Sequence, residues 1–155
     1  MRKPTSNKKY IRLLESLIAG GGAFIGLSFI GLIAQQADSM MIIAPFGATA
    51  VLLFSAPKSN FSRPWNIFGG YIISTLVGAY VISYTGGGWF VIGGALGLTI
   101  ALMHLGDVVH PPAGANLLII TQGHLSVYLL EPLLAGLLTL IIVAMSVERI
   151  KTKFT

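Results

Sequence analysis

Hydrophobic residues fill six stretches of this chain, and short polar stretches separate them. The apolar stretches cover residues 13–34, 40–56, 67–84, 89–106, 111–122 and 127–147. A helix needs about 20 residues to cross the hydrocarbon core of a bilayer, and the first, third, fourth and sixth stretches reach or approach that length. The second and fifth are short and contain proline and glycine. The pattern predicts an all-α, polytopic membrane helix bundle with four long spans and two short, broken helices.

The two short stretches carry nearly the same sequence. The segment that begins at Pro45 reads PFGATAVLLF, and the segment that begins at Pro112 reads PAGANLLII. The flanks match as well, because GGAF at 21–24 recurs as GGAL at 93–96. A duplicated unit with a broken middle helix is typical of small transporters and channels. This organisation predicts a first membrane repeat at 13–85 and a second at 86–148, between basic end segments at 1–12 and 149–155.

Basic residues occur only at borders of the apolar stretches. They are Arg2, Lys3, Lys8, Lys9 and Arg12, then Lys58 and Arg63, then Arg149, Lys151 and Lys153. Positively charged loops stay in the cytoplasm, and six crossings with cytoplasmic termini would place all three clusters there. If the second stretch instead re-entered the membrane, Lys58 and Arg63 would lie outside. Three crossings per repeat would invert one repeat relative to the other, so that the short helices meet near the midplane.

Composition supports the membrane assignment. The chain is 54% hydrophobic and 10% charged, with a mean hydropathy of +0.81, which soluble domains do not reach. The sequence pI of 9.8 does not indicate nucleic-acid binding, since the basic clusters border apolar spans. The stretch 13–34 is too long for a signal peptide and is interpreted as a retained span. A bacterial inner-membrane location is expected.

Small and hydroxyl residues inside the apolar stretches predict how the helices pack. Small residues four positions apart let helices approach closely in lipid. Two glycine pairs have this spacing: Gly22 with Gly26, and Gly93 with Gly97. Hydroxyl side chains are expected to bond between helices or to their own backbone. They include Ser74, Thr75, Thr99 and Thr139.

The two proline motifs are the candidate substrate site. Proline suits the first turn of a helix, where backbone N–H groups have no helical partner, and such N–H groups bind anions. The expected substrate-binding residues are Pro45, Gly47, Ala48, Thr49, His110, Pro111, Pro112, Gly114, Ala115 and Asn116. Glycine would let a ligand approach the backbone, while the side chains of Thr49 and Asn116 would add donors. The alternative is that the prolines only start ordinary helices.

His110 precedes the proline pair, and its side chain has two possible roles. It would bind an anion or transfer a proton, since the pKa of histidine lies near physiological pH, or it would make a structural hydrogen bond. His104 and Asp107 lie three residues apart, and with His110 they would form an incomplete metal site. A solvated pair is the favoured interpretation, so no metal or other cofactor is expected. Motifs of known enzyme classes are also absent from the sequence, and no enzymatic activity is predicted.

The motif His110-Pro111-Pro112-Ala113-Gly114-Ala115 resembles that of the HPP family of integral membrane proteins. The resemblance extends through 46–54 and covers about residues 11–150. Some members, from cyanobacteria and chloroplasts, are nitrite transporters, and the family is usually described with four spans. This chain departs from the family pattern at three positions. Asn116 stands where threonine is usual, Trp65 where arginine often occurs, and Tyr71 where histidine is common.

The resemblance implies a membrane permease or channel for a small inorganic anion such as nitrite, with the lipid bilayer as its other partner. A homo-oligomer is expected, because a chain of 16.4 kDa offers little protein to enclose a pore. The alternative function is a non-transporting membrane scaffold or sensor module. An intramembrane enzyme that uses His104, Asp107 and His110 is a third hypothesis, and it would require a bound metal.

Overall fold

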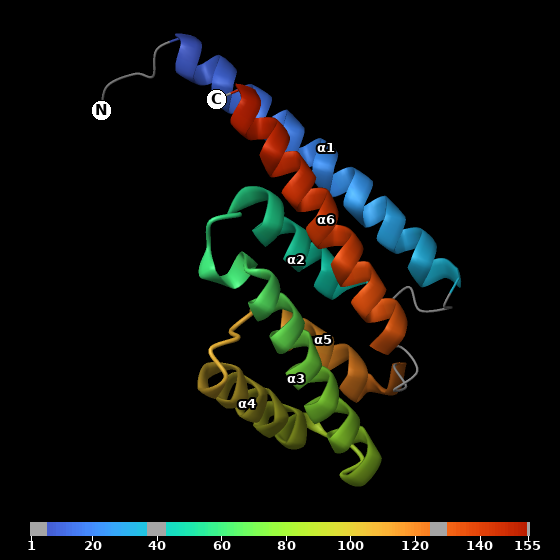
Figure 1. Ribbon diagram of the computed structural model, residues 1–155. Helices are drawn as coiled ribbons and strands as arrows, with labels where there is room; N and C mark the ends of the chain where they lie inside the picture. Colours follow the sequence, from blue (N-terminus) through green and yellow to red (C-terminus); the bar gives the residue numbers. More distant parts are fainter. Residues whose placement is uncertain (1–5, 37–42, 125–129, 155) are drawn as a thin grey trace.

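The computed structural model describes residues 6–36, 43–124 and 130–154 (Figure 1). Its elements are α1 (Ser6–Gln36), α2 (Ile43–Ser55), the short turn η2 (Asn60–Ser62), α3 (Pro64–Tyr84), α4 (Trp89–Leu105), α5 (Pro112–Ile119), η3 (Ile120–His124) and α6 (Leu130–Phe154). The described part of the chain is helical and contains no strand. The all-α prediction is confirmed. Arg2 and Lys3 lie outside the described residues.

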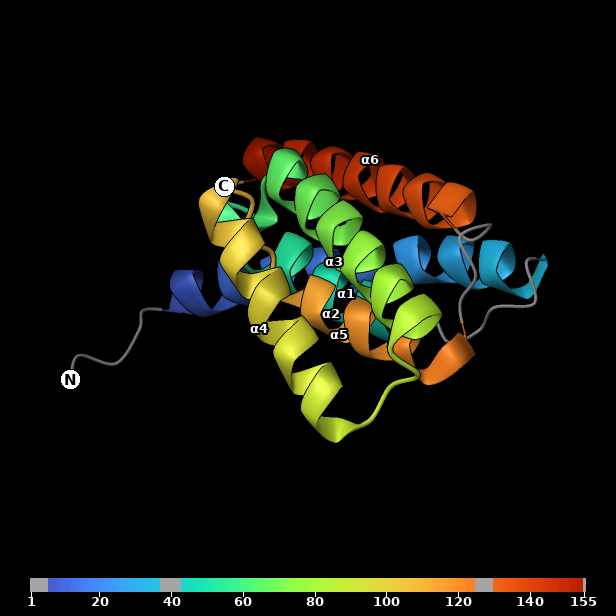
Figure 2. The ribbon, with the colours of Figure 1, turned by 90° about the horizontal axis from the view of Figure 1, so that it is seen from below.

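The helices form a bundle with the two short helices in its middle (Figures 1 and 2). On one side α1 and α6 pack against each other along much of their length, and α2 packs on both. On the other side α3 and α4 pack together, and both contact α5. Helices α2 and α5 then touch each other. The two proline motifs, which are far apart in the sequence, are therefore neighbours in space.

Three helices of the described chain are long and apolar enough to cross a membrane. They are Lys8–Gln35, Pro64–Tyr84 and Glu131–Thr152, and only 22%, 39% and 33% of their most apolar windows are buried. Such exposed apolar surface is what a bilayer would cover. Four long spans were expected, but α4 has 17 residues and belongs with the shorter apolar helices. It begins where the predicted stretch begins, directly after Gly86, Gly87 and Gly88, whose φ angles are positive and are readily adopted only by glycine.

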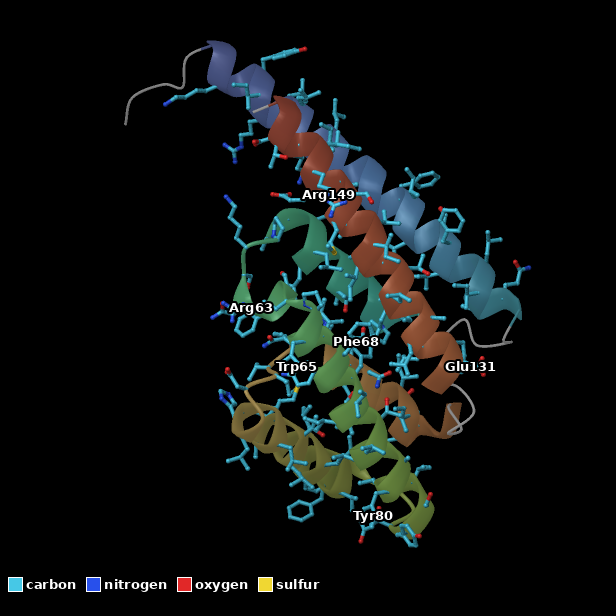
Figure 3. The ribbon with its side chains drawn as sticks, in the orientation of Figure 1. Arg63, Trp65, Phe68, Tyr80, Glu131 and Arg149 are labelled. Carbon is cyan, nitrogen blue, oxygen red and sulfur yellow. The ribbon has the colours of Figure 1, made fainter. Side chains whose placement is uncertain are left out.

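Hydrogen bonds tie together several segments at one end of the bundle. The Lys151 Nζ atom of α6 donates a hydrogen bond to the Phe54 carbonyl at the end of α2 (3.1 Å). The His110 Nδ1 atom bonds the Phe61 carbonyl (2.7 Å) and so links the α4–α5 connection to the α2–α3 connection. The start of α1 and the end of α6 lie at this same end (Figure 1). Figure 3 shows Arg63 and Arg149 toward this end and Glu131 toward the other.

The largest core cluster joins α1, α2, α3 and α6 and includes Phe46, Phe54 and Leu140. A Cβ atom at Gly22 would lie 2.7 Å from Val147 Cγ2, and one at Gly26 would lie 2.8 Å from Leu140 Cδ1. The predicted close approach is therefore confirmed for this pair. At Gly93 and Gly97 a Cβ atom would meet nothing within 4 Å, so this pair does not mediate helix packing in the chain.

Candidate functional site

A row of hydrogen bonds crosses the centre of the bundle where α2, α3 and the start of α5 meet. Thr49, Tyr71 and His110 are all 0% exposed. The Thr49 Oγ1 atom lies 3.0 Å from Tyr71 Oη and 2.9 Å from His110 Nε2. The other ring nitrogen of His110 forms a hydrogen bond with the carbonyl of Phe61, which lies in η2. Polar groups from four segments of the chain thus meet in an apolar interior.

The direction of each bond in this row follows from its carbonyl end. His110 lies in the connection between α4 and α5, and burial lowers the pKa of its imidazole to about 4, so it is neutral at pH 7. A carbonyl only accepts, so the His110 Nδ1 atom carries the hydrogen and donates it to Phe61. The His110 Nε2 atom then accepts from the Thr49 hydroxyl, which in turn accepts from Tyr71. We call this row the His110 chain.

The second motif places its polar side chain in a separate cluster on α3. The Asn116 Nδ2 atom donates to Ser74 Oγ (2.9 Å) and to Thr75 Oγ1 (3.0 Å). Ser74 in turn donates to the Tyr71 carbonyl (3.0 Å), so Tyr71 connects this cluster with the His110 chain. The Asn116 Oδ1 atom is buried, with no hydrogen-bond partner among the described residues. The expectation that hydroxyl residues bond between helices is confirmed at Ser74 and Thr75.

The backbone N–H groups of the two motifs were expected to be free donors at helix starts, and the structure shows that they are not. Helix α2 begins at Ile43, so Gly47, Ala48 and Thr49 lie beyond its first turn, where N–H groups bond within the helix. Helix α5 does begin at Pro112. There the N–H of Ala113 donates to the His110 carbonyl and that of Gly114 donates to the Pro111 carbonyl, both at 3.0 Å. The sequence pattern placed free N–H donors in both motifs because it could not show these turn bonds.

The remaining predicted site residues do not share one surface. Pro45 and Pro112 are buried, whereas Pro111 and Ala48 are exposed. Ala115 is half-buried, and a Cβ atom at Gly114 would touch Leu96 at 3.4 Å. Gly47 lines a groove with α1 and α6, and it lies two positions before Thr49, about 200° around the helix. The structure therefore brings together Thr49 and His110 and leaves Gly47 on another face.

The suggested metal ligands are not gathered into a site. His104 and Asp107 are exposed at the end of α4, whereas His110 is buried. Within the described ranges, no three His, Cys, Asp or Glu side chains are placed to hold a metal ion. Thr99, expected to form a hydrogen bond, has a buried hydroxyl with no partner among the described residues.

Tyr71 is the residue that sequence reasoning missed. It stood out only as a departure from the family pattern, and its phenol completes the His110 chain. Its ring also stacks on Phe46 of the first motif, with centroids 5.8 Å apart. Tyr71 lies inside an apolar stretch, and a buried tyrosine needs a partner for its hydroxyl. The sequence therefore indicated that Tyr71 needs a hydrogen-bond partner, but it could not identify Thr49 as that partner.

The bundle, with its apolar exterior and buried polar centre, defines an α-helical integral membrane protein. The pattern of the HPP transmembrane region matches residues 8–154, and the chain belongs to this family. It is 31% identical over 144 residues to each of two transmembrane proteins of Dictyostelium discoideum. These matches cover 84% of the chain and 50% and 46% of the relatives, so the chain spans about half their length. No solved structure matches it.

Proposed function

We propose that this chain is a permease or channel for a small inorganic anion, with nitrite as the first candidate substrate. The carrying observation is the buried polar centre formed by the His110 chain and the Asn116 cluster. Polar and ionisable groups inside a membrane bundle are expensive and commonly mark substrate or proton pathways. Thr49, Asn116 and His110 are the residues proposed to contact the substrate, and no enzymatic step is part of the proposal.

The described arrangement corresponds to a sealed conformation of such a pathway. Both Asn116 Nδ2 hydrogens are used by Ser74 and Thr75, and the Thr49 hydroxyl bonds His110. An entering anion would exchange these protein acceptors for its own oxygens. Each donor would keep a hydrogen bond, now to the anion, and this would offset part of the cost of removing the anion from water.

An inverted repeat is part of the proposal, and the packing supports it. If the first, second and third helices of each repeat correspond, the contact of α1 with α6 is equivalent to that of α4 with α3. The contact of α2 with α6 is then equivalent to that of α5 with α3, and α2 meets α5. An inverted repeat in a transporter places its broken helices at the repeat interface in this way.

Six crossings with cytoplasmic termini are proposed as the topology. Arg63 and Arg149 lie toward the end where α1 begins and α6 ends (Figure 3), and Lys58 lines the same groove as Lys151, which supports this topology. The chain has no cysteine, so Lys58→Cys and Thr85→Cys, the latter at an exposed position after α3, would each carry one label site. We expect an impermeant maleimide to label Thr85→Cys from outside the cell and Lys58→Cys only after lysis. External labelling of Lys58→Cys would contradict the topology.

Nitrite flux into proteoliposomes tests the function. At neutral pH, where leakage of nitrous acid is smallest, we expect flux above that of protein-free vesicles. Thr49→Val and Asn116→Leu should each reduce it several-fold. Thr139→Val is the matched control, since the Thr139 hydroxyl bonds only the Ala135 carbonyl of its own helix. Flux no faster than the leak, from correctly inserted protein, would overturn the nitrite assignment.

A non-transporting scaffold or sensor module is the second candidate, and one observation favours it. Every hydrogen-bond donor of Thr49, Tyr71, His110 and the Asn116 side chain has a protein acceptor in the described arrangement. A fully satisfied polar network of this kind is sufficient to specify how helices pack, without binding a substrate. This function predicts that Thr49→Val and Asn116→Leu lower stability, while neither variant changes the flux of any anion.

A further inference from the structure

A groove between α1, α2 and the end of α6 has a volume of about 830 Å³. It lies outside the buried polar centre and is open to the exterior. Its walls change in character along its length. Near the termini it is lined by charged side chains, among them Arg12, Lys58 and Lys151. Farther along it is lined by small and apolar residues, which include Ala23, Gly47 and Leu27.

We propose that this groove binds one anionic phospholipid, with the phosphate at the charged mouth and an acyl chain along α1. A basic recess between membrane helices is the kind of site that holds anionic lipid headgroups. Among the described residues, neither Arg12 nor Lys58 forms an ion pair. A phosphate would supply a partner for both.

The charge of the mouth matches one phosphate. Lys151 Nζ and Glu148 Oε2 lie 4.0 Å apart and offset each other. The remaining charged side chains of the groove are Arg12, Lys58 and Glu15, which leave one net positive charge. A lipid such as phosphatidylglycerol carries one negative charge, whereas phosphatidylcholine is neutral overall. The mouth therefore favours the anionic lipid.

The length of the groove matches one leaflet. Along α1 its lining runs from Arg12 to Leu27, which at 1.5 Å per residue is about 22 Å. The apolar part, from Ala19 to Leu27, covers about 12 Å, close to the roughly 15 Å of hydrocarbon in half a bilayer. A groove that is charged at one end and apolar for one leaflet fits a phospholipid better than a helix of a second copy, which would continue across the membrane.

Two neighbouring glycines offer a matched test. A Cβ atom at Gly20 or at Gly21 meets nothing within 4 Å, so a larger side chain fits at either position. Only Gly20 lines the groove. Gly20→Leu should therefore fill the groove where an acyl chain would lie, while Gly21→Leu should leave it open with the same change in helix composition.

Native mass spectrometry of the full chain in detergent, titrated with phosphatidylglycerol or phosphatidylcholine, measures the binding. We expect stronger binding of phosphatidylglycerol, roughly fivefold weaker binding for each of Arg12→Gln and Lys58→Gln, and little change for Arg63→Gln, which lies at the same end outside the groove. Gly20→Leu should abolish the bound lipid, and Gly21→Leu should retain it.

Four results would overturn the proposal. The first is equal binding of the two lipids, and the second is equal loss in Gly20→Leu and Gly21→Leu. The third is a dimer that Gly20→Leu dissociates without changing lipid binding, because the groove would then hold a second copy of the chain. Glycerol phosphate without acyl chains should bind far more weakly than the lipid, and equal binding would likewise show that only the charged mouth is used.

Discussion

Helices α2 and α5 carry the same motif and use it differently. Helix α2 has 13 residues and holds Pro45 inside its first turn, whereas α5 has eight residues and begins at Pro112. Their equivalent polar residues, Thr49 and Asn116, have different partners. Thr49 bonds Tyr71 and His110, and Asn116 bonds Ser74 and Thr75.

The difference shows that helix α3 decides what each motif does. Thr49 and Asn116 both contact this one helix, at Tyr71 and at Ser74 and Thr75. Two similar motifs can thus yield an asymmetric polar centre, because they meet different parts of α3. The predictions below test this asymmetry.

The largest effect is expected at His110. His110→Leu would leave the Phe61 carbonyl and the Thr49 hydroxyl without their partner, and each orphaned buried group costs about 1–3 kcal/mol. We therefore expect a loss of about 2–5 kcal/mol in the free energy of unfolding, measured in detergent. His110→Asn keeps a donor for the Phe61 carbonyl and should lose clearly less. Equal losses in the two variants would show that hydrogen bonding at His110 contributes little.

Acid should weaken the same chain of hydrogen bonds. The pKa of His110 is lowered by burial to about 4, whereas an unfolded histidine has a pKa of about 6.5. Protonation therefore favours the unfolded protein, and stability present above pH 6.5 is lost as the pH falls toward 4. The wild-type protein should lose more stability over this window than His110→Asn does. Parallel pH profiles of the two proteins, from thermal unfolding, would contradict a neutral, buried His110.

Exchanging the two polar residues tests the asymmetry directly. Thr49→Asn adds atoms at a fully buried position between Tyr71 and His110 and should cost about 1–3 kcal/mol through overpacking. Asn116→Thr loses one of two hydrogen bonds to α3 and should cost about 0.5–1.5 kcal/mol. Chemical denaturation of both variants measures the difference. If both exchanges are neutral, the motifs are interchangeable and the asymmetry is unimportant for stability.

The smallest effect is expected at Tyr71. Tyr71→Phe removes the first donor of the His110 chain but leaves the bond from Thr49 to His110 and the stacking on Phe46. We expect a loss of about 0.5–1.5 kcal/mol. Tyr80→Phe is the control, since Tyr80 is 63% exposed and should change stability by less than about 0.5 kcal/mol. A Tyr71→Phe variant as stable as this control would make the first bond of the chain dispensable.

Much of the fold was predictable from local patterns. Apolar stretches marked the helices, since a chain in lipid must satisfy its backbone hydrogen bonds within each helix. The spacing of Gly22 and Gly26 predicted a close helix contact, and α1 packs on α6 there. The same spacing at Gly93 and Gly97 predicted a contact that the chain does not make. A small residue permits close approach, but the neighbouring helix determines whether the approach occurs.

The candidate site was predictable only in part. The polar residues in apolar surroundings, Thr49, Asn116 and His110, could be found from sequence because such residues are rare in spans. Their partners could not be found in the same way. Thr49 bonds His110 across 61 positions of the chain, and no periodicity of either segment carries that information.

By itself, the sequence determined the family, the helical class and the positions of the polar residues, because hydropathy and motif are properties of short segments. Tertiary structure decided which of these residues meet. It paired Thr49 with Tyr71 and His110, engaged the N–H groups of α5 in its own first turn, and opened a groove beside Gly47. Hydrogen bonds act over about 3 Å, so they depend on how helices cross, and crossing is set by packing between segments that are distant in sequence.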